Sequence, residues 1–130
     1  MFLSTICKIE EELYEKNAKK YLKLKLSTND VLRVIEIHKK MYDVLTLPYV
    51  EIPLEDDILK VKVPYRYNRV TCKFSGSKVV QEMKKGDVVE VKIQCMGPWF
   101  YKPKYCGIAW KLELISLNEQ ATNPQDVVQI

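Results

Sequence analysis

The 130-residue sequence contains only four glycines and one histidine, and these shortages exclude several kinds of site. A phosphate-binding loop of the Walker type needs glycines clustered around a lysine, and no such cluster is present. A structural zinc site needs about four nitrogen or sulfur ligands at short paired spacings. None of the four cysteines stands in a C-x-x-C pair, so the sequence predicts no metal or cofactor site. We expect reduced core thiols at Cys7, Cys72, Cys95 and Cys106.

Long apolar runs and catalytic sets are missing as well. No apolar stretch approaches the roughly 18 residues that a membrane-spanning helix needs. The first residues lack the basic region of a signal peptide, and three acids at 10–12 follow a short apolar stretch. No nucleophile lies near a candidate base, and the expected role of His38 is helix packing. We therefore expect an intracellular protein, in the cytoplasm or nucleus of a host cell, that is not an enzyme and does not bind membranes.

Positive charge is concentrated in one part of the chain. Residues 1–59 carry nine lysines and arginines against eleven acids, whereas residues 60–111 carry twelve against three, a net charge of +9. Residues 112–130 carry three acids and no base. A segment this basic attracts polyanions and is the first mark sought in a nucleic-acid binder. A solvated basic face on a protein with another role is the alternative.

Alternating apolar residues predict several strands. Residues 21–26 alternate strictly and predict a half-buried strand with its three leucines inward. Residues 58–65 predict a second strand that forms a hairpin with residues 69–74. The outer face of this hairpin is expected to hold Lys60, Lys62, Arg69 and Lys73. Two further strands are predicted at 89–95 and 107–115. In the last one, the inward residues are expected to be Ile108, Trp110, Leu112 and Leu114.

Two helices are predicted between these strands. Residues 27–30 form a capping signal, and apolar residues recur at helical spacing over 31–45. A short helix over 77–85 is expected to end at Gly86. Residues 8–20 alternate charges with few apolar residues, which predicts a short helix or an irregular lead-in.

With the first predicted helix set aside, the order of elements is that of an OB-fold, five strands with a helix between the third and fourth. We expect a mainly β (α+β) fold, a five-stranded OB-type barrel with an extra helix between its first two strands. Residues 1–117 form one domain in this interpretation. Residues 118–130 are mostly polar and are expected to form a loosely ordered C-terminal tail.

Aromatic and basic residues are interleaved in two segments. The richer one is 95–107, which we expect to be an exposed loop between the last two strands, and the turn at 65–69 repeats the mixture. Aromatic rings stack on unpaired bases and lysines neutralise phosphates, so this combination favours single-strand binding. Of the three consecutive aromatics at 99–101, we expect at least one in the core and one outside it. The candidate nucleic-acid-binding residues are Lys60, Lys62, Tyr65, Arg66, Tyr67, Arg69, Lys73, Trp99, Phe100, Tyr101, Lys102, Lys104 and Tyr105.

Four features of residues 58–117 carry a family resemblance. They are Lys-Val-Lys-Val-Pro-Tyr at 60–65, Lys-Lys-Gly-Asp-Val-Val-Glu-Val at 84–91, an aromatic-rich hairpin, and Gly-Ile-Ala-Trp at 107–110. The pattern resembles the OB-fold single-stranded-DNA-binding proteins of phages and large DNA viruses. The resemblance implies a protein that coats single strands in replication, recombination or repair. Many such proteins end in an acidic tail, whereas the last ten residues here contain one acid, Asp126.

Three functions stay open on the sequence alone. The first is single-stranded DNA binding with little base specificity. Its partners would be replication or recombination proteins, and the protein could form homo-oligomers. The second is an OB-type module that binds protein, with the helix over 31–45 as its contact surface. The third is an RNA-binding OB domain, because the sequence does not show whether a 2′-hydroxyl is read.

Overall fold

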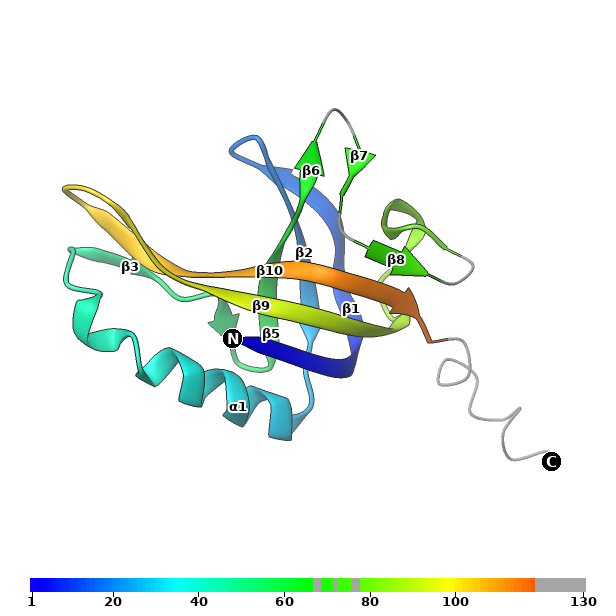
Figure 1. Ribbon diagram of the computed structural model, residues 1–130, viewed down its shortest axis with the longest axis horizontal. Helices are drawn as coiled ribbons and strands as arrows, with labels where there is room; N and C mark the ends of the chain where they lie inside the picture. Colours follow the sequence, from blue (N-terminus) through cyan, green and yellow to red (C-terminus); the bar gives the residue numbers. More distant parts are fainter. Residues whose placement is uncertain (67–68, 72, 76–77, 119–130) are drawn as a thin grey trace.

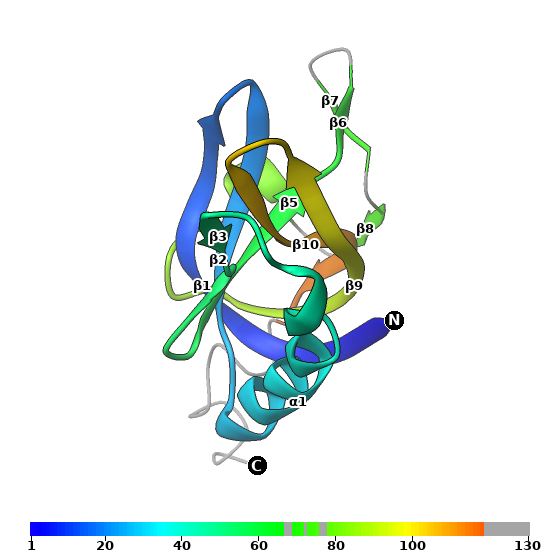
Figure 2. The ribbon, with the colours of Figure 1, turned by 90° about the vertical axis from the view of Figure 1, so that its left-hand side faces the viewer.

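A strongly curved sheet forms a barrel in the computed structural model, which describes residues 1–66, 69–71, 73–75 and 78–118. Figures 1 and 2 show its long strands, β1 (Phe2–Lys16), β2 (Lys19–Lys25), β5 (Ile58–Val63), β9 (Val88–Tyr101) and β10 (Tyr105–Leu117). Two short strands extend the two ends of the sheet, β3 (Tyr49–Glu51) beside β10 and β4 (Leu54–Glu55) beside β5.

The pairing of the strands closes the barrel. β1 pairs antiparallel with both β2 and β9, β2 pairs with β5, and β9 pairs with β10. The ring is completed where β10 runs parallel to β5, with Lys111 opposite Lys62. The expected class, a mainly β fold of the OB type, is therefore confirmed.

The prediction for residues 8–20 is wrong, because most of these residues belong to the first strand, β1. These residues are not a helix or lead-in, because β1 continues to Lys16 and turns into β2 through Asn17 and Ala18, at φ of 53° and 63°. Register shifts follow Ile9, where the chain turns acidic, and they interrupt the alternation that would have marked a strand. The extra helix consequently follows the second strand of the barrel, not the first as predicted.

The barrel interior is lined by the predicted alternating apolar residues. On β2 and β5 the buried residues are Leu22, Leu24, Leu59, Val61 and Val63. On β9 and β10 they include Val89, Val91, Ile93, Ile108, Trp110 and Leu112. The prediction fails at Leu114, which is exposed, while Ile115 is buried in its place. A register shift between Leu112 and Leu114 reverses the two faces of β10 from that point.

Helix α1 (Thr28–Lys39) lies across the lower end of the barrel in Figures 1 and 2. The predicted cap is confirmed, because the amide of Asp30 donates to Oγ of Ser27 over 3.3 Å. The helix is shorter than the predicted 31–45, and a 3-10 turn at Tyr42–Val44 follows it. Its buried residues include Val34 and Ile37, so the apolar stripe faces the barrel.

His38 joins α1 to the barrel, which confirms its predicted packing role. The side chain is 1% exposed, and its Nε2 accepts a hydrogen bond of 2.9 Å from Nε1 of Trp110 on β10. An imidazole that accepts at Nε2 is neutral and carries its proton on Nδ1. Burial lowers the pKa of His38 below 6.5, because the charged form would lose its hydration.

Folding stability should therefore fall as the pH drops below about 6.5, the unfolded-state pKa of histidine. The folded state favours neutral His38, so protons bind the unfolded chain more readily until the pH passes the lower folded pKa. Urea midpoints at pH 7.5 and 5.5 measure the loss. His38→Gln is the control, because it removes the only histidine of the chain and should flatten this part of the profile. Equal midpoints for the parent protein would contradict the prediction.

Residues 64–86 depart from the predicted hairpin and short helix. β6 (Tyr65–Arg66) pairs with β7 (Arg69–Val70) in a separate two-stranded sheet, and β8 (Lys73–Ser75) runs parallel to β10. The predicted common face of Lys60, Lys62, Arg69 and Lys73 is therefore wrong. The predicted helix over 77–85 is a single 3-10 turn at Val80–Glu82 within its described part. Gly86 does end this segment, with a positive φ of 93°.

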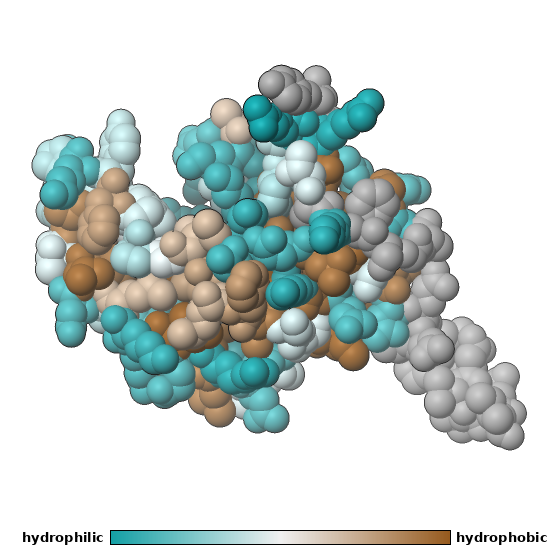
Figure 3. Space-filling model, in the orientation of Figure 1, coloured by the Kyte–Doolittle hydropathy of each residue, from teal (hydrophilic) through white to brown (hydrophobic). Residues whose placement is uncertain are grey.

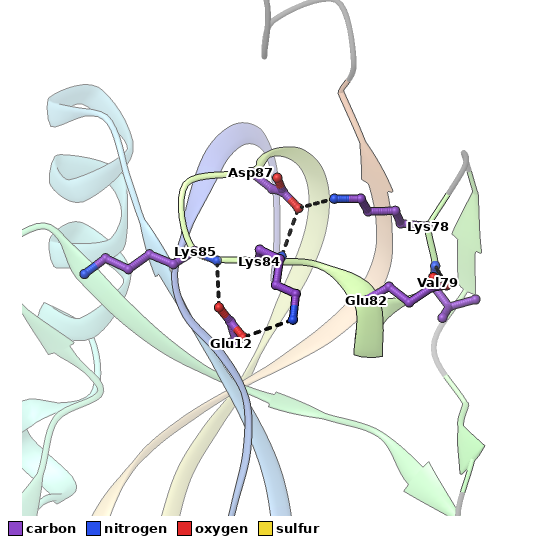
Figure 4. Close-up of polar contacts among 7 residues, drawn as sticks. All are labelled: Glu12, Lys78, Val79, Glu82, Lys84, Lys85 and Asp87. Carbon is purple, nitrogen blue, oxygen red and sulfur yellow. Dashed lines mark hydrogen bonds and ion pairs between the residues drawn. The ribbon is translucent and has the colours of Figure 1, made fainter.

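Several lysines of the basic segment are neutralised around this 3-10 turn (Figure 4). Asp87 accepts from the amide of Lys84 over 2.9 Å and from Nζ of Lys78 over 3.1 Å. Burial would raise the pKa of Asp87, but these hydrogen bonds and charges hold it below its ordinary value. Glu12 of β1 lies 3.8 Å from Nζ of Lys84 and accepts from the amide of Lys85. Lys78 and Lys84 therefore have acidic partners at this end of the barrel.

The described cysteines are free and buried, as expected. Burial, with the nearby charge of Asp30, raises the pKa of the Cys7 thiol to about 12, so it stays protonated. Cys72 lies outside the described residues, as does the predicted tail from residue 119. Within the described part of the chain, no helix has the length and apolar character to cross a membrane.

Candidate functional site

The hairpin of β9 and β10 projects from the barrel, at the left of Figure 1. The loop predicted over 95–107 is instead mostly strand, because β9 runs to Tyr101 and β10 resumes at Tyr105. Tyr101 is 72% exposed, and Phe100 and Tyr105 are about half exposed. None of the three consecutive aromatics is buried, so the expectation of a core residue among them is wrong. Trp99 is half-buried.

Strand β3 braces this hairpin. It pairs parallel with β10, so that Tyr49 lies opposite Tyr105 and Glu51 opposite Gly107. The Tyr49 and Tyr105 rings stack with centroids 5.4 Å apart and planes inclined by 27°. The segment that follows α1 therefore holds the hairpin in position against the barrel.

The Trp99 ring packs against Gly107, where no side chain stands in its way. A Cβ on Gly107 would lie 2.6 Å from the indole ring and 2.4 Å from the carbonyl oxygen of Glu51. Both distances are shorter than any real Cβ contact, and one of the two neighbours is backbone. Glycine at this position therefore lets the indole and β3 both lie close to the backbone of β10.

A groove of about 970 Å³ runs between this hairpin and the outer faces of β2 and β5. Figure 3 shows the surface hollowed between the hairpin at the left and the strand tips above. Its aromatic lining residues are Tyr21, Trp99, Phe100, Tyr101, Tyr105 and the edge of the buried Trp110. Its charged lining residues are Lys19, Lys60, Lys62, Lys111 and one acid, Glu51.

The lysines of the groove differ in their ionic partners. Lys60 pairs with Glu51, and its ammonium lies 4.9 Å from the centroid of the Tyr21 ring. Lys111 pairs with Glu113 at 3.4 Å. Lys19 and Lys62 are exposed and make no ion pair with any residue that the structure describes. The groove thus offers exposed positive charge beside aromatic rings. Proteins that bind single-stranded nucleic acid combine these two features.

No protein-family model and no curated protein matches the sequence. The fold is similar to that of a phage protein. One solved structure with a similar fold is that of gp2.5, a single-stranded DNA binding protein encoded by bacteriophage T7, with a TM-score of 0.58. The two chains are 13% identical, and the match covers 89% of this chain and 90% of the T7 protein. At this identity the likeness to the T7 protein concerns the fold.

The groove contains about half of the predicted site residues. Those that line it are Lys60, Lys62, Trp99, Phe100, Tyr101 and Tyr105, while Lys102 and Lys104 lie exposed at the hairpin turn. Tyr65, Arg66 and Arg69 belong to the separate β6–β7 hairpin, where Nζ of Lys20 lies 5.1 Å from the Tyr65 centroid. Lys73 lies on β8, and Tyr67 lies outside the described residues.

The sequence prediction missed Tyr21, Lys19 and Lys111. Tyr21 belongs to the outer face of an alternating strand, and that signal was visible. Its place in the groove depends on pairing with Lys62 across β2 and β5, and a single sequence does not show this register.

A second cavity, of about 630 Å³, adjoins the groove at Lys60 and is acidic. Its acids are Glu10, Glu11, Glu12, Glu55 and Asp56. Lys23 within it pairs with Glu11 at 3.2 Å. A polyanion that follows the groove is therefore repelled beyond Lys60, which gives the candidate site one electrostatic boundary.

Proposed function

We propose that this protein binds single-stranded DNA in the groove between the β9–β10 hairpin and strands β2 and β5, without catalysis and with little base specificity. One observation carries the proposal: exposed aromatic side chains and lysines share this groove, and only one acid lies among its described lining residues. The neighbouring cavity does not share this mixture, because it is dominated by acids.

Stacking and phosphate contact supply the affinity. A base stacked on an aromatic ring contributes about 1–3 kcal/mol, and every base has a face that stacks. A lysine that neutralises a phosphate releases counterions, which makes the affinity fall with salt. In a duplex each base is already stacked on neighbouring bases, so the rings of Phe100 and Tyr101 have no free base face to stack on. The shared fold with a single-stranded DNA binding protein supports this choice of ligand.

The proposed ligand fits a cellular role in replication, recombination or repair inside a host cell, with proteins of those processes as partners. The alternative role, protein binding through the helix after β2, would have to use the residues of α1 that stay exposed, such as Leu32. The residues Val34, Ile37 and His38 of α1 are buried against the barrel, so its apolar stripe is already covered.

Fluorescence anisotropy with labelled oligonucleotides tests the proposal. Single-stranded DNA, duplex DNA of the same length and single-stranded RNA are compared at two salt concentrations. Single-stranded DNA should bind far better than duplex, with a slope of log affinity on log salt of roughly −0.7 per phosphate neutralised. Equal affinity for duplex, or a flat salt response, would contradict the proposal. Stronger binding of RNA would assign the groove to RNA.

A further inference from the structure

Glu51 is the only acid among the described residues that line the groove. Its Oε1 forms an ion pair with Nζ of Lys60 across the groove wall. The side chain of Glu51 is 51% exposed and that of Lys60 is 22% exposed, so solvent and ligands reach the pair. The Glu51 carboxylate is therefore paired with a lysine, Lys60, that a nucleic-acid phosphate would also bind.

Lys60 is placed where stacking and phosphate contact would meet. Its ammonium lies over Tyr21, one of the aromatic residues of the groove, and it stands at the boundary with the acidic cavity. Two acids of that cavity pair with other cations, since Lys23 pairs with Glu11 and Lys85 with Glu10. Among the described residues, Glu51 is the ionic partner of Lys60.

The backbone holds Glu51 in place. Glu51 is the last residue of β3 and lies opposite Gly107 in the parallel pairing with β10. Its carbonyl oxygen would lie 2.4 Å from a Cβ on Gly107, so β3 approaches β10 closely at this residue. The carboxylate is thus presented to the groove from a paired strand.

We infer that Glu51 is an affinity-setting residue of the groove, whose carboxylate competes with the phosphates of a bound strand for Lys60. The inference rests on the proposed function. A phosphate that binds Lys60 has to displace Glu51 from it. The competition weakens binding at low salt and matters less at high salt, because exposed charges are screened.

Glu51→Gln tests the inference, because it keeps the shape of the side chain and one acceptor oxygen and removes the charge. Its affinity for a labelled single-stranded DNA oligonucleotide is measured by anisotropy at low and high salt. The affinity should rise about two- to fivefold at low salt, the range set by an exposed ion pair. The gain should shrink at high salt, so the salt slope becomes steeper.

Two controls separate this mechanism from a general change of charge. Glu36→Gln changes the net charge equally but breaks an exposed pair with Lys39 on α1, outside the groove lining, and should have a smaller effect. In a Lys60→Gln background, Glu51→Gln should give little or no gain, because the contested cation is gone.

The outcomes distinguish the inference from the proposed function. If the parent protein binds single strands and Glu51→Gln binds no more tightly than Glu36→Gln, the inference is wrong and the proposed function stands. A full gain in the Lys60→Gln background would also overturn the inference. A parent protein that binds no single strand overturns both.

Discussion

Replacing Trp110 by alanine should lower the free energy of unfolding by about 3–5 kcal/mol. The side chain is 1% exposed and is among the largest that are fully buried in the barrel. Its removal leaves a cavity beneath the groove and takes the hydrogen-bond donor from Nε2 of the buried His38. Urea unfolding followed by circular dichroism measures the change.

Trp99→Ala is the matched control for this experiment, because it removes the same atoms from a half-buried position on the hairpin. Its cost in stability should be clearly smaller, since the ring packs on Gly107 at the edge of the sheet and not inside the barrel. Equal losses of stability for the two variants would contradict the distinction between a core tryptophan and a groove tryptophan.

The same Trp99→Ala variant should weaken the binding of single-stranded DNA by about 1–3 kcal/mol, or about 5- to 150-fold. Trp99 lines the groove and is held in position by β3 and Gly107, so its loss removes one stacking surface. No charge is removed, and the dependence of affinity on salt should therefore stay the same. Anisotropy titrations over a series of salt concentrations measure both quantities.

Lys62→Ala provides the contrast with the Trp99 variant. Lys62 is exposed, lines the groove and has no ion pair among the described residues. Its removal should weaken binding and also reduce the salt slope by about 0.7, the contribution of one phosphate. If Lys62→Ala leaves the slope unchanged, or Trp99→Ala changes it as strongly, the assigned roles of charge and stacking are wrong.

Local alternation predicted the barrel strands well wherever pairing is regular. The inward residues of β2, β5 and β9 follow strict period two, and burial confirms them. The predictions failed where the register shifts. Such a shift hid the strand character of β1 after Ile9, and another moved Leu114 from the core to the surface. Shifts of this kind depend on the partner strand, so the alternation within one segment does not reveal them.

The candidate site could be predicted by residue type but not by arrangement. Interleaved aromatic and basic residues indicated the β9–β10 hairpin, and the outer face of an alternating strand indicated Lys60 with Lys62. Lys111 and Glu51 join them only because β10 runs parallel to β5 and to β3. Both pairings connect segments far apart in the sequence. A single sequence therefore suggested several residues of the candidate site and missed the acid within it.

The pairing of β1 with β9 also determines how the chain can fold. Phe2 lies opposite Gln94, so the barrel cannot close before most of the chain has been synthesised. β1 and β2 can form their hairpin early, while the other edge of β1 stays open until β9 emerges from the ribosome. Folds rich in such distant pairs fold in milliseconds to seconds, slowly for small domains. An open strand edge can pair with another chain, so aggregation is most expected during this interval.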